Sequence, residues 1–130
     1  MASMIDFLRA LLISLGVIRK PDFLVRVVAD HPSQAVLETG VIYVVGGAGY
    51  SKWAYLRCPT GNGDVIQLSL QPKHRPRWDV TKDWLGRATV HPSVRQTEGS
   101  YAHFWIINGA VQWCEDTGKP PVFRQSNWQA

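Results

Sequence analysis

A two-residue turn near the C-terminus constrains the fold of this chain more than any other feature. The segments 101–107 and 110–114 are rich in apolar and aromatic residues, and Asn108-Gly109 joins them. This pattern is typical of a type I′ β-hairpin, because both turn residues tolerate a positive φ. The turn sets the register, which predicts the pairs Ile107 with Ala110, Ile106 with Val111, Trp105 with Gln112, Phe104 with Trp113, and His103 with Cys114.

The predicted register gives the hairpin two different faces, because successive side chains of a strand alternate. One face is wholly apolar and is expected to contact the core: Phe104, Ile106, Val111 and Trp113. The opposite face carries His103, Trp105, Gln112 and Cys114. Opposed strand residues have Cβ atoms about 4.5–5.5 Å apart. The His103 imidazole and the Cys114 thiol are therefore expected to meet.

Earlier segments also have the composition of strands and are separated by glycine- and proline-containing turns. They are 23–28, 41–45, 50–57, 65–70, 77–80 and 88–90. Gly46-Gly-Ala-Gly49 joins two of them as a plain turn, because no Gly-Lys-Ser/Thr ending of a phosphate loop follows it. We predict a mainly β fold, in which hairpins form a small twisted antiparallel sheet or a half-open barrel.

An apolar helix is expected before the β-domain, over residues 3–19, and Pro21 prevents its continuation. Its apolar stripe is wider than that of an ordinary amphipathic helix. The helix either packs on its own domain or on a second copy, or it docks on a partner or a membrane surface. The residues expected to make these contacts are Phe7, Leu8, Leu11 and Leu15. No apolar run approaches the ~20 residues that a membrane span needs.

The length of 130 residues fits one domain. We expect a helix at 1–20, a β-domain at 21–114 and a polar C-terminal tail at 115–130. The composition, 45% hydrophobic and 18% charged, is that of an ordinary globular chain. Two cysteines are too few for a disulfide scaffold, so a cytoplasmic protein is expected.

Two cysteines and two histidines are candidates for a zinc site, since Cys2His2 is a common closed ligand set. They are Cys58, His91, His103 and Cys114. They are dispersed along the chain, so packing neighbours or a Cys–His nucleophile pair are the alternatives. No acidic residue adjoins either histidine, and Ser93 lies in no recognisable nucleophile turn. The pattern therefore assigns no catalytic residue.

A basic segment at 73–78 combines positive charge with an indole ring, as in proteins that bind single-stranded nucleic acid. Its candidate contacts are Lys73, Arg75, Arg77 and Trp78. The net charge of +4 permits a polyanionic partner. A solvated connecting loop is the alternative interpretation.

Several motifs in order resemble a bacterial family catalogued as domain of unknown function 6527. The motifs are Leu37-Glu-Thr-Gly-Val-Ile-Tyr-Val-Val45, Cys58-Pro59, Arg75-Pro-Arg-Trp78, His91-Pro-Ser-Val94, His103-Phe104 and Gln112-Trp-Cys114. The resemblance covers roughly residues 22–114. It implies a small zinc-binding protein, since members are grouped with such proteins. Some members lie near ubiquitin-like conjugation genes, and others lie in phages and mobile elements.

The chain departs from that family at three cysteines. The family typically has Cys-Pro-Cys-Gly-Cys-Gly where this chain has Cys58-Pro-Thr-Gly-Asn-Gly63, and Gly-Cys-x-x-His where it has Gly99-Ser-Tyr-Ala-His103. The joint absence implies that this copy has lost a metal site. Alternatively, a reduced site remains. We therefore expect either no cofactor or one zinc ion held by Cys58, His91, His103 and Cys114.

These observations together favour a non-enzymatic accessory or protein-interaction module of a bacterial or phage system. A protein partner is expected, and self-association through the N-terminal helix is an additional expectation. The first alternative is a nucleic-acid-binding protein that uses segment 73–78. The second is a Cys-dependent hydrolase.

Overall fold

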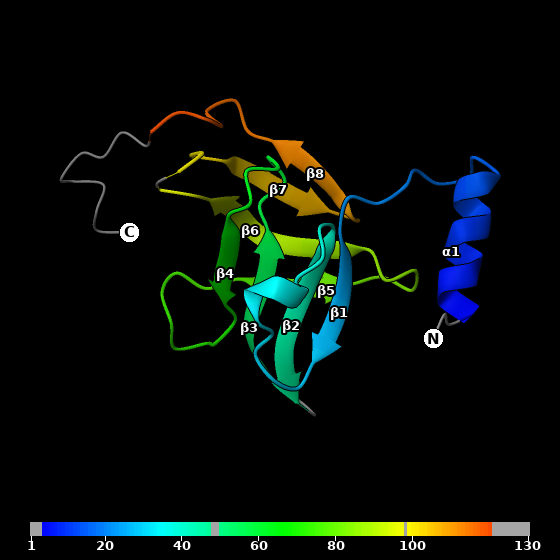
Figure 1. Ribbon diagram of the computed structural model, residues 1–130, viewed down its shortest axis with the longest axis horizontal. Coiled ribbons are helices and arrows are strands. Elements are labelled where there is room, and N and C mark those ends of the chain that lie inside the picture. Colours follow the sequence, from blue (N-terminus) through cyan, green and yellow to red (C-terminus); the bar gives the residue numbers. More distant parts are fainter. Residues whose placement is uncertain (1–3, 48–49, 98, 121–130) are drawn as a thin grey trace.

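The computed structural model describes residues 4–47, 50–97 and 99–120. It contains two four-stranded sheets after one helix, which confirms the predicted mainly β fold class (Figure 1). The first sheet has the order β1-β2-β3-β4, with strands Leu24–Val28, Val41–Gly47, Tyr50–Arg57 and Val65–Ser69. The second has the order β5-β6-β7-β8, with strands Asp79–Lys82, Ala88–Arg95, His103–Ile107 and Ala110–Trp113. A short 3-10 helix spans Gln34–Val36.

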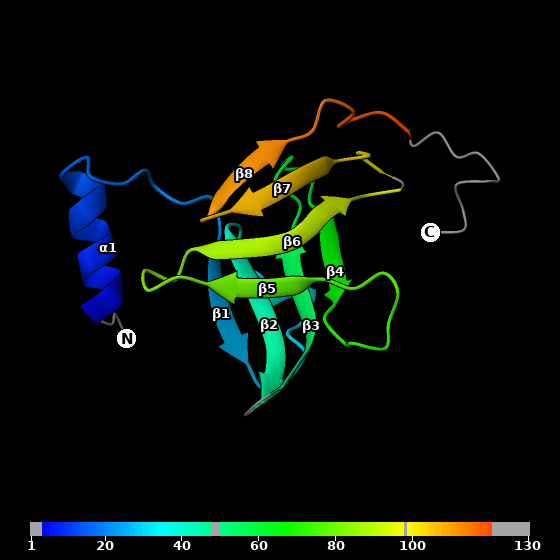
Figure 2. The same ribbon diagram turned by 180° about the vertical axis from the view of Figure 1, so that it is seen from behind.

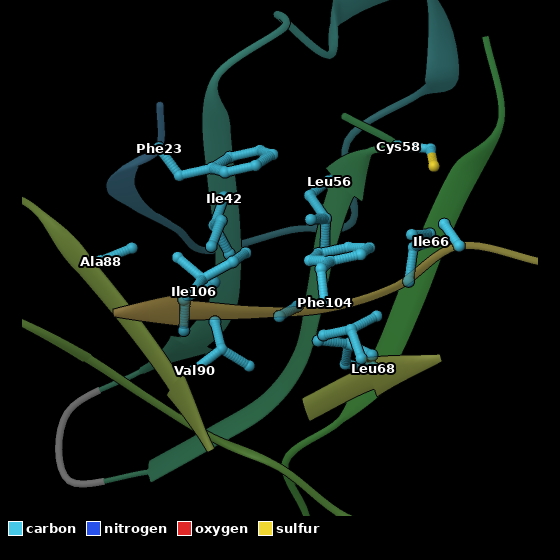
Figure 3. Packing of buried hydrophobic residues seen from close by; sticks show 14 of the residues in the cluster. Phe23, Ile42, Leu56, Cys58, Ile66, Leu68, Ala88, Val90, Phe104 and Ile106 are labelled. Atoms are coloured by element: carbon cyan, nitrogen blue, oxygen red, sulfur yellow. The ribbon is translucent and has the colours of Figure 1, made fainter. Parts of the chain in front are cut away.

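The hydrophobic core lies between the two sheets, whose strands cross one another (Figure 2). Ile42 and Leu56 of the first sheet are fully buried, as are Phe104 and Ile106 of the second. Figure 3 shows these side chains packed together with Phe23, which leads into β1. Because one face of each sheet is buried here, the polar side chains of the same strands point outward. The outer face of the second sheet carries the candidate site.

One strand pair differs from the antiparallel hairpins expected from the sequence. Strand β1 pairs with β2 in parallel, while the other pairs are antiparallel. Parallel neighbours need a crossover connection instead of a tight turn. The link 29–40, which contains the 3-10 helix, provides that connection. The turn chemistry of hairpins is visible in a sequence, whereas such a crossover has no comparable signature.

The predicted C-terminal hairpin is confirmed pair by pair in the register of β7 and β8. Asn108 and Gly109 have φ values of 49° and 82°, as a type I′ turn requires. The Cys114 N–H donates to the His103 carbonyl at 2.9 Å, which extends the register beyond β8. Trp113 was expected in the core but is 47% exposed, because β8 is the edge strand of its sheet.

The hairpin between β2 and β3 is also present, although residues 48–49 of its expected turn lie outside the described residues. Its register shifts between Val45 and Gly46. A Cβ added at Gly46 would lie 2.4 Å from the Tyr50 carbonyl oxygen, so only glycine fits there. This close approach explains why the turn begins with glycine.

Helix α1 spans Met4–Ser14 and is shorter than the predicted helix over 3–19. It ends in a Schellman motif: the Val17 and Gly16 N–H groups donate to the carbonyls of Leu12 and Ile13, and Gly16 has a φ of 75°. Both views show α1 standing apart from the sheets (Figures 1 and 2). Within the described part of the chain, no helix has the length and apolar character needed to cross a membrane.

Candidate active site

Three side chains on the outer face of the second sheet form a continuous hydrogen-bonded series. The Ser93 hydroxyl oxygen lies 3.1 Å from His103 Nε2. The other ring nitrogen of His103, Nδ1, lies 2.6 Å from Asp116 Oδ1. Ser93 and His103 come from the neighbouring strands β6 and β7, and Asp116 follows β8. Hydroxyl, imidazole and carboxylate in this order are the arrangement of a Ser-His-Asp catalytic triad.

An irregular segment of β6 presents Ser93. The register against β7 shifts between Val90 and Val94, both of which are buried and anchor β6 in the core. From one anchor to the next, β6 advances by four positions while β7 advances by two. The β6 segment between the anchors is therefore displaced outward. The Trp78 indole N–H donates to the Ser93 carbonyl at 3.1 Å. The serine is thus held by both its strand and a side chain from outside the strand.

A tight turn after β8 brings Asp116 back onto β7. The His103 N–H donates to the Thr117 hydroxyl at 3.0 Å, and the Gly118 N–H donates to the Tyr101 carbonyl at 2.9 Å. These bonds tie the turn to the start of the strand that carries the histidine. Residues 115–120, expected as the beginning of a tail, are therefore part of the candidate site. The remaining tail residues, 121–130, lie outside the described residues.

The carboxylate of Asp116 is kept ionised by its two neighbours. The hydrogen bond from His103 lowers the pKa of Asp116 below its usual value, and the charge of Arg95 lowers it further. Arg95 Nη2 donates to Asp116 Oδ2 at 2.6 Å, so each carboxylate oxygen has its own donor. An ionised carboxylate on Nδ1 leaves Nε2 free to accept a proton from the serine.

Cys114, the residue expected opposite His103, lies beside the triad but is a poor nucleophile. Burial raises the pKa of its thiol, and the negative charge of Asp116 raises it further. A raised pKa keeps the side chain as a thiol, whereas the thiolate is the reactive form. His103 Nε2 faces Ser93. The geometry therefore favours serine as the nucleophile over the Cys–His pair considered from the sequence.

The four predicted zinc ligands are distributed over three places. Among the described residues, His103 and Cys114 form a group with Asp116, in which the ligand atoms lie within 4.8 Å of one another. His91 is exposed and its ring lies 5.9 Å from that of Trp105. Cys58 is buried elsewhere. The structure thus brings together His103 and Cys114, as the hairpin register predicted, without the other two.

Cys58 belongs to a polar hydrogen-bonded cluster. Its thiol donates to the Gln96 side-chain oxygen at 3.3 Å and accepts a bond from the Thr60 hydroxyl at 3.2 Å. The Ser100 hydroxyl lies 3.8 Å from the same sulfur. Thr60 and Ser100 are two of the positions at which the resemblance expects cysteine. Asn62, the third, donates to Asp64 at 3.0 Å.

The basic segment predicted to bind nucleic acid has intramolecular partners in the structure. Arg75 donates to two carbonyls of its own loop, those of Pro72 and His74. Arg77 pairs with Asp79 at 2.8 Å. Trp78, the expected stacking residue, is half-buried and supports Ser93. Lys73 is exposed.

Sequence reasoning missed Ser93 and Asp116 as site residues. The His91-Pro-Ser-Val94 motif was noticed, but nothing local marks its serine as a nucleophile. Asp116 is far from both histidines in sequence, and it was assigned to the tail. The useful signal was the hairpin register: a residue shortly after Cys114 must lie near His103, once the chain turns back.

One of the comparisons with known proteins identifies a family. A family model described as bacterial ubiquitination-like system serine protease (BubE) matches residues 27–114. The chain belongs to this family. The comparisons found no similar curated protein and no similar solved structure.

Membership of the BubE family supports association with a bacterial ubiquitination-like system, and with it protein partners. The link to ubiquitin-like conjugation, implied earlier by the resemblance, is thereby confirmed at this general level. The matched range contains Ser93, His103 and Cys114 and ends before Asp116. The acidic member of the triad is therefore visible only in the structure.

Proposed function

We propose that this protein is a serine protease of a bacterial ubiquitination-like system. The observation that carries the proposal is the hydrogen-bonded series from Ser93 through His103 to Asp116. The family description, a serine protease of such a system, supports the same chemistry, and we infer that the substrate is a protein of that system. The non-enzymatic interaction module favoured by the sequence is the competing hypothesis.

The geometry supports the usual steps of acyl transfer. Ser93 Oγ attacks the carbonyl carbon of an amide bond while His103 Nε2 takes the hydroxyl proton. The same proton then passes to the leaving amine, and an ester to Ser93 remains. Water hydrolyses this ester by the same route and releases the carboxylate product. Asp116 stays ionised throughout and stabilises the positively charged imidazole.

The location of the triad suits a protein substrate. Ser93 and His103 lie on the outer face of a sheet, and the neighbouring residues His91, Pro92 and Arg95 are exposed. An extended peptide segment can therefore approach the serine from solvent. Such a segment would contact the exposed residues Pro92 and His91, and the His91 ring lies 5.9 Å from that of Trp105.

A fluorophosphonate probe tests the proposal without knowledge of the substrate. An activated serine displaces fluoride from phosphorus, and intact-mass analysis records the added phosphonyl group. We expect labelling of one site in the full chain, its loss in Ser93→Ala, and its retention in Ser69→Ala. Ser69 is a matched control, because its hydroxyl also lies beside a histidine nitrogen, His74 Nδ1 at 2.6 Å. Unchanged labelling of Ser93→Ala, or none of the full chain, would favour the non-enzymatic module.

We infer that helix α1 contributes a docking surface to this function. Phe7, Leu11 and Leu15 are 65%, 42% and 66% exposed, while Arg9 links the helix to the domain through the Leu85 carbonyl at 2.6 Å. The predicted contact residue Leu8 is half-buried. Deletion of residues 1–20 should leave the sheets folded and change self-association or partner binding. Unfolding of the truncated chain would show instead that the helix belongs to the core.

We also infer that folding requires no zinc ion. The thiol of Cys58 has hydrogen-bonding partners of its own, and the expected ligands His91 and Cys114 are not beside it. A structural zinc contributes about 10–16 kcal/mol in small zinc peptides. Chelator should therefore leave the melting temperature unchanged. A large fall in the melting temperature would show instead that the fold depends on a metal ion.

A further inference from the structure

A thiol that the proposed hydrolysis does not use lies beside the triad. Ligand atoms of His103, Cys114 and Asp116 all lie within 4.8 Å of one another. Imidazole nitrogen, thiolate sulfur and carboxylate oxygen are the three donor types that bind zinc in proteins. We propose that these residues form an inhibitory zinc site, whose regulatory effect rests on the proposed function of the triad.

Zinc and the catalytic arrangement exclude one another. His103 Nδ1 and Asp116 Oδ1 are 2.6 Å apart. Two ligands with bonds of about 2.0 Å to one tetrahedral zinc are roughly 3.3 Å apart. An ion between these atoms therefore breaks the bond that orients the imidazole. Coordination through Nε2 instead would displace Ser93, which lies 3.1 Å away. Whichever ring nitrogen binds zinc, His103 can no longer act as the general base for Ser93.

Cys114 makes this group a zinc site and not merely a His–Asp pair. Strand pairing places the residue opposite His103, since its N–H donates to the His103 carbonyl. Its thiol releases a proton to solvent when zinc binds, because the thiolate is the ligand. The three side chains leave a fourth position for water, as in open zinc sites.

Arg95 keeps the zinc exchangeable. Its guanidinium pairs with Asp116 Oδ2 at 2.6 Å, so only Oδ1 remains for the metal or for His103. The nearby positive charge opposes a divalent cation and lowers the affinity of the site. Such a site responds to changes in free zinc, whereas a closed structural site stays filled.

The test uses the full chain with zinc, cobalt and two matched cysteine variants. Cys114→Ser removes the proposed ligand, and Cys58→Ser changes the other cysteine, which lies in the polar cluster with Gln96. Cobalt(II) reports thiolate ligation by a charge-transfer absorption band. We expect this band in the unmodified chain and in Cys58→Ser, and its loss in Cys114→Ser. Circular dichroism melting verifies that both variants are folded.

Fluorophosphonate labelling measures the regulatory effect. Zinc near one equivalent should slow labelling of Ser93, and chelator should restore it. Cys114→Ser should label normally and need at least about tenfold more zinc for the same inhibition, because even loss of a supporting group costs 10–100-fold in affinity. Cys58→Ser should match the unmodified chain.

The outcomes separate this proposal from the proposed function. Normal labelling that zinc leaves unchanged, with no cobalt band, would overturn the zinc site and leave the protease intact. Equal zinc inhibition of Cys114→Ser would likewise overturn it. A cobalt band that depends on Cys114, in a chain that is not labelled at all, would support the metal site and reject the protease.

Discussion

Among the described residues, a serine of each sheet lies beside a histidine, and one of these two pairs has the arrangement of a catalytic site. Ser93 lies 3.1 Å from His103 Nε2, while Ser69 lies 2.6 Å from His74 Nδ1. The first histidine is fixed by Asp116 on its other nitrogen. Among the described residues, no carboxylate hydrogen-bonds to His74, whose ring packs near Trp53.

The two serines also differ in what surrounds them. Ser69 is buried at 8% exposure, and its oxygen also accepts the Gln71 N–H at 3.3 Å. Those bonds hold the loop after β4 in place. Ser93 is half-buried on an outer face. A short distance between hydroxyl and imidazole is therefore insufficient evidence of catalysis. The ring nitrogen involved, the acid behind it and access to the serine decide the role.

Replacement of the acid should give the largest difference between the two pairs. Asp116→Asn places a donor where His103 Nδ1 needs an acceptor, which favours the wrong tautomer. Labelling of Ser93 should slow by the order of 10⁴-fold, as the corresponding change does in a known triad. The rate of fluorophosphonate labelling measures this effect. Glu115→Gln is the control, because this neighbouring acid is exposed. Equal rates in both variants would remove Asp116 from the site.

Removal of the arginine behind the acid should give a smaller effect. Arg95→Gln releases Asp116 Oδ2 and lets the carboxylate turn away from His103. Misplacement by about 1 Å can cost 10²-fold, so we expect a loss of about 10- to 100-fold. Arg75→Gln is the matched control beside the other pair, since within the described part of the chain this side chain donates to carbonyls of its own loop. Full rescue by Arg95→Lys would show that charge alone positions the acid.

For the free energy of unfolding, in contrast to labelling, Ser69 should matter more than Ser93. Ser69→Ala removes the partner of the half-buried Gln71 N–H and of His74 Nδ1, which costs about 1–2 kcal/mol in the free energy of unfolding. Ser93→Ala should cost less than about 1 kcal/mol, because its site is open to water. Urea titration measures both values. A larger loss for Ser93→Ala would mean that the triad is chiefly a structural network.

The smallest expected effect is that of acid on the turn that precedes β6, the strand that carries Ser93. Asp83 closes the turn that leads into β6 and accepts bonds from the Leu85 and Arg87 N–H groups and the Arg87 side chain. Burial by itself would raise the pKa of Asp83, but these bonds lower it overall. Its contribution is therefore complete above the ordinary pKa near 4 and is lost as the pH falls through the lowered value.

The variant Asp83→Asn isolates this contribution. At pH 7 it should lower the free energy of unfolding by about 1 kcal/mol, through the lost bond to a charged partner. As the pH falls through the lowered pKa, the difference from the unmodified chain should shrink, because Asp83 then becomes protonated as well. Urea titrations at pH 7 and over a series of acidic pH values check this. A difference that grows on acidification would contradict the sign of the shift.

Local patterns in the sequence were sufficient for the mainly β class, the C-terminal hairpin and the contact of His103 with Cys114. Each depends on residues close together in the chain: a turn dipeptide that accepts positive φ, and alternation that follows from strand geometry. The helix was also predictable, although its end at Ser14 came from Gly16 and not from Pro21.

The tertiary structure alone decided which residues form the candidate site. Ser93 comes from an irregular part of β6, and His103 comes from β7. Asp116 comes from a turn that is held at the start of β7, because Thr117 accepts the His103 N–H and the Gly118 N–H donates to the Tyr101 carbonyl. No spacing in the sequence encodes that return of the chain. The same reason explains why Cys58 and His91, which match the residue types of a zinc set, lie elsewhere: residue type is written in the sequence, but proximity arises only when the sheets pack.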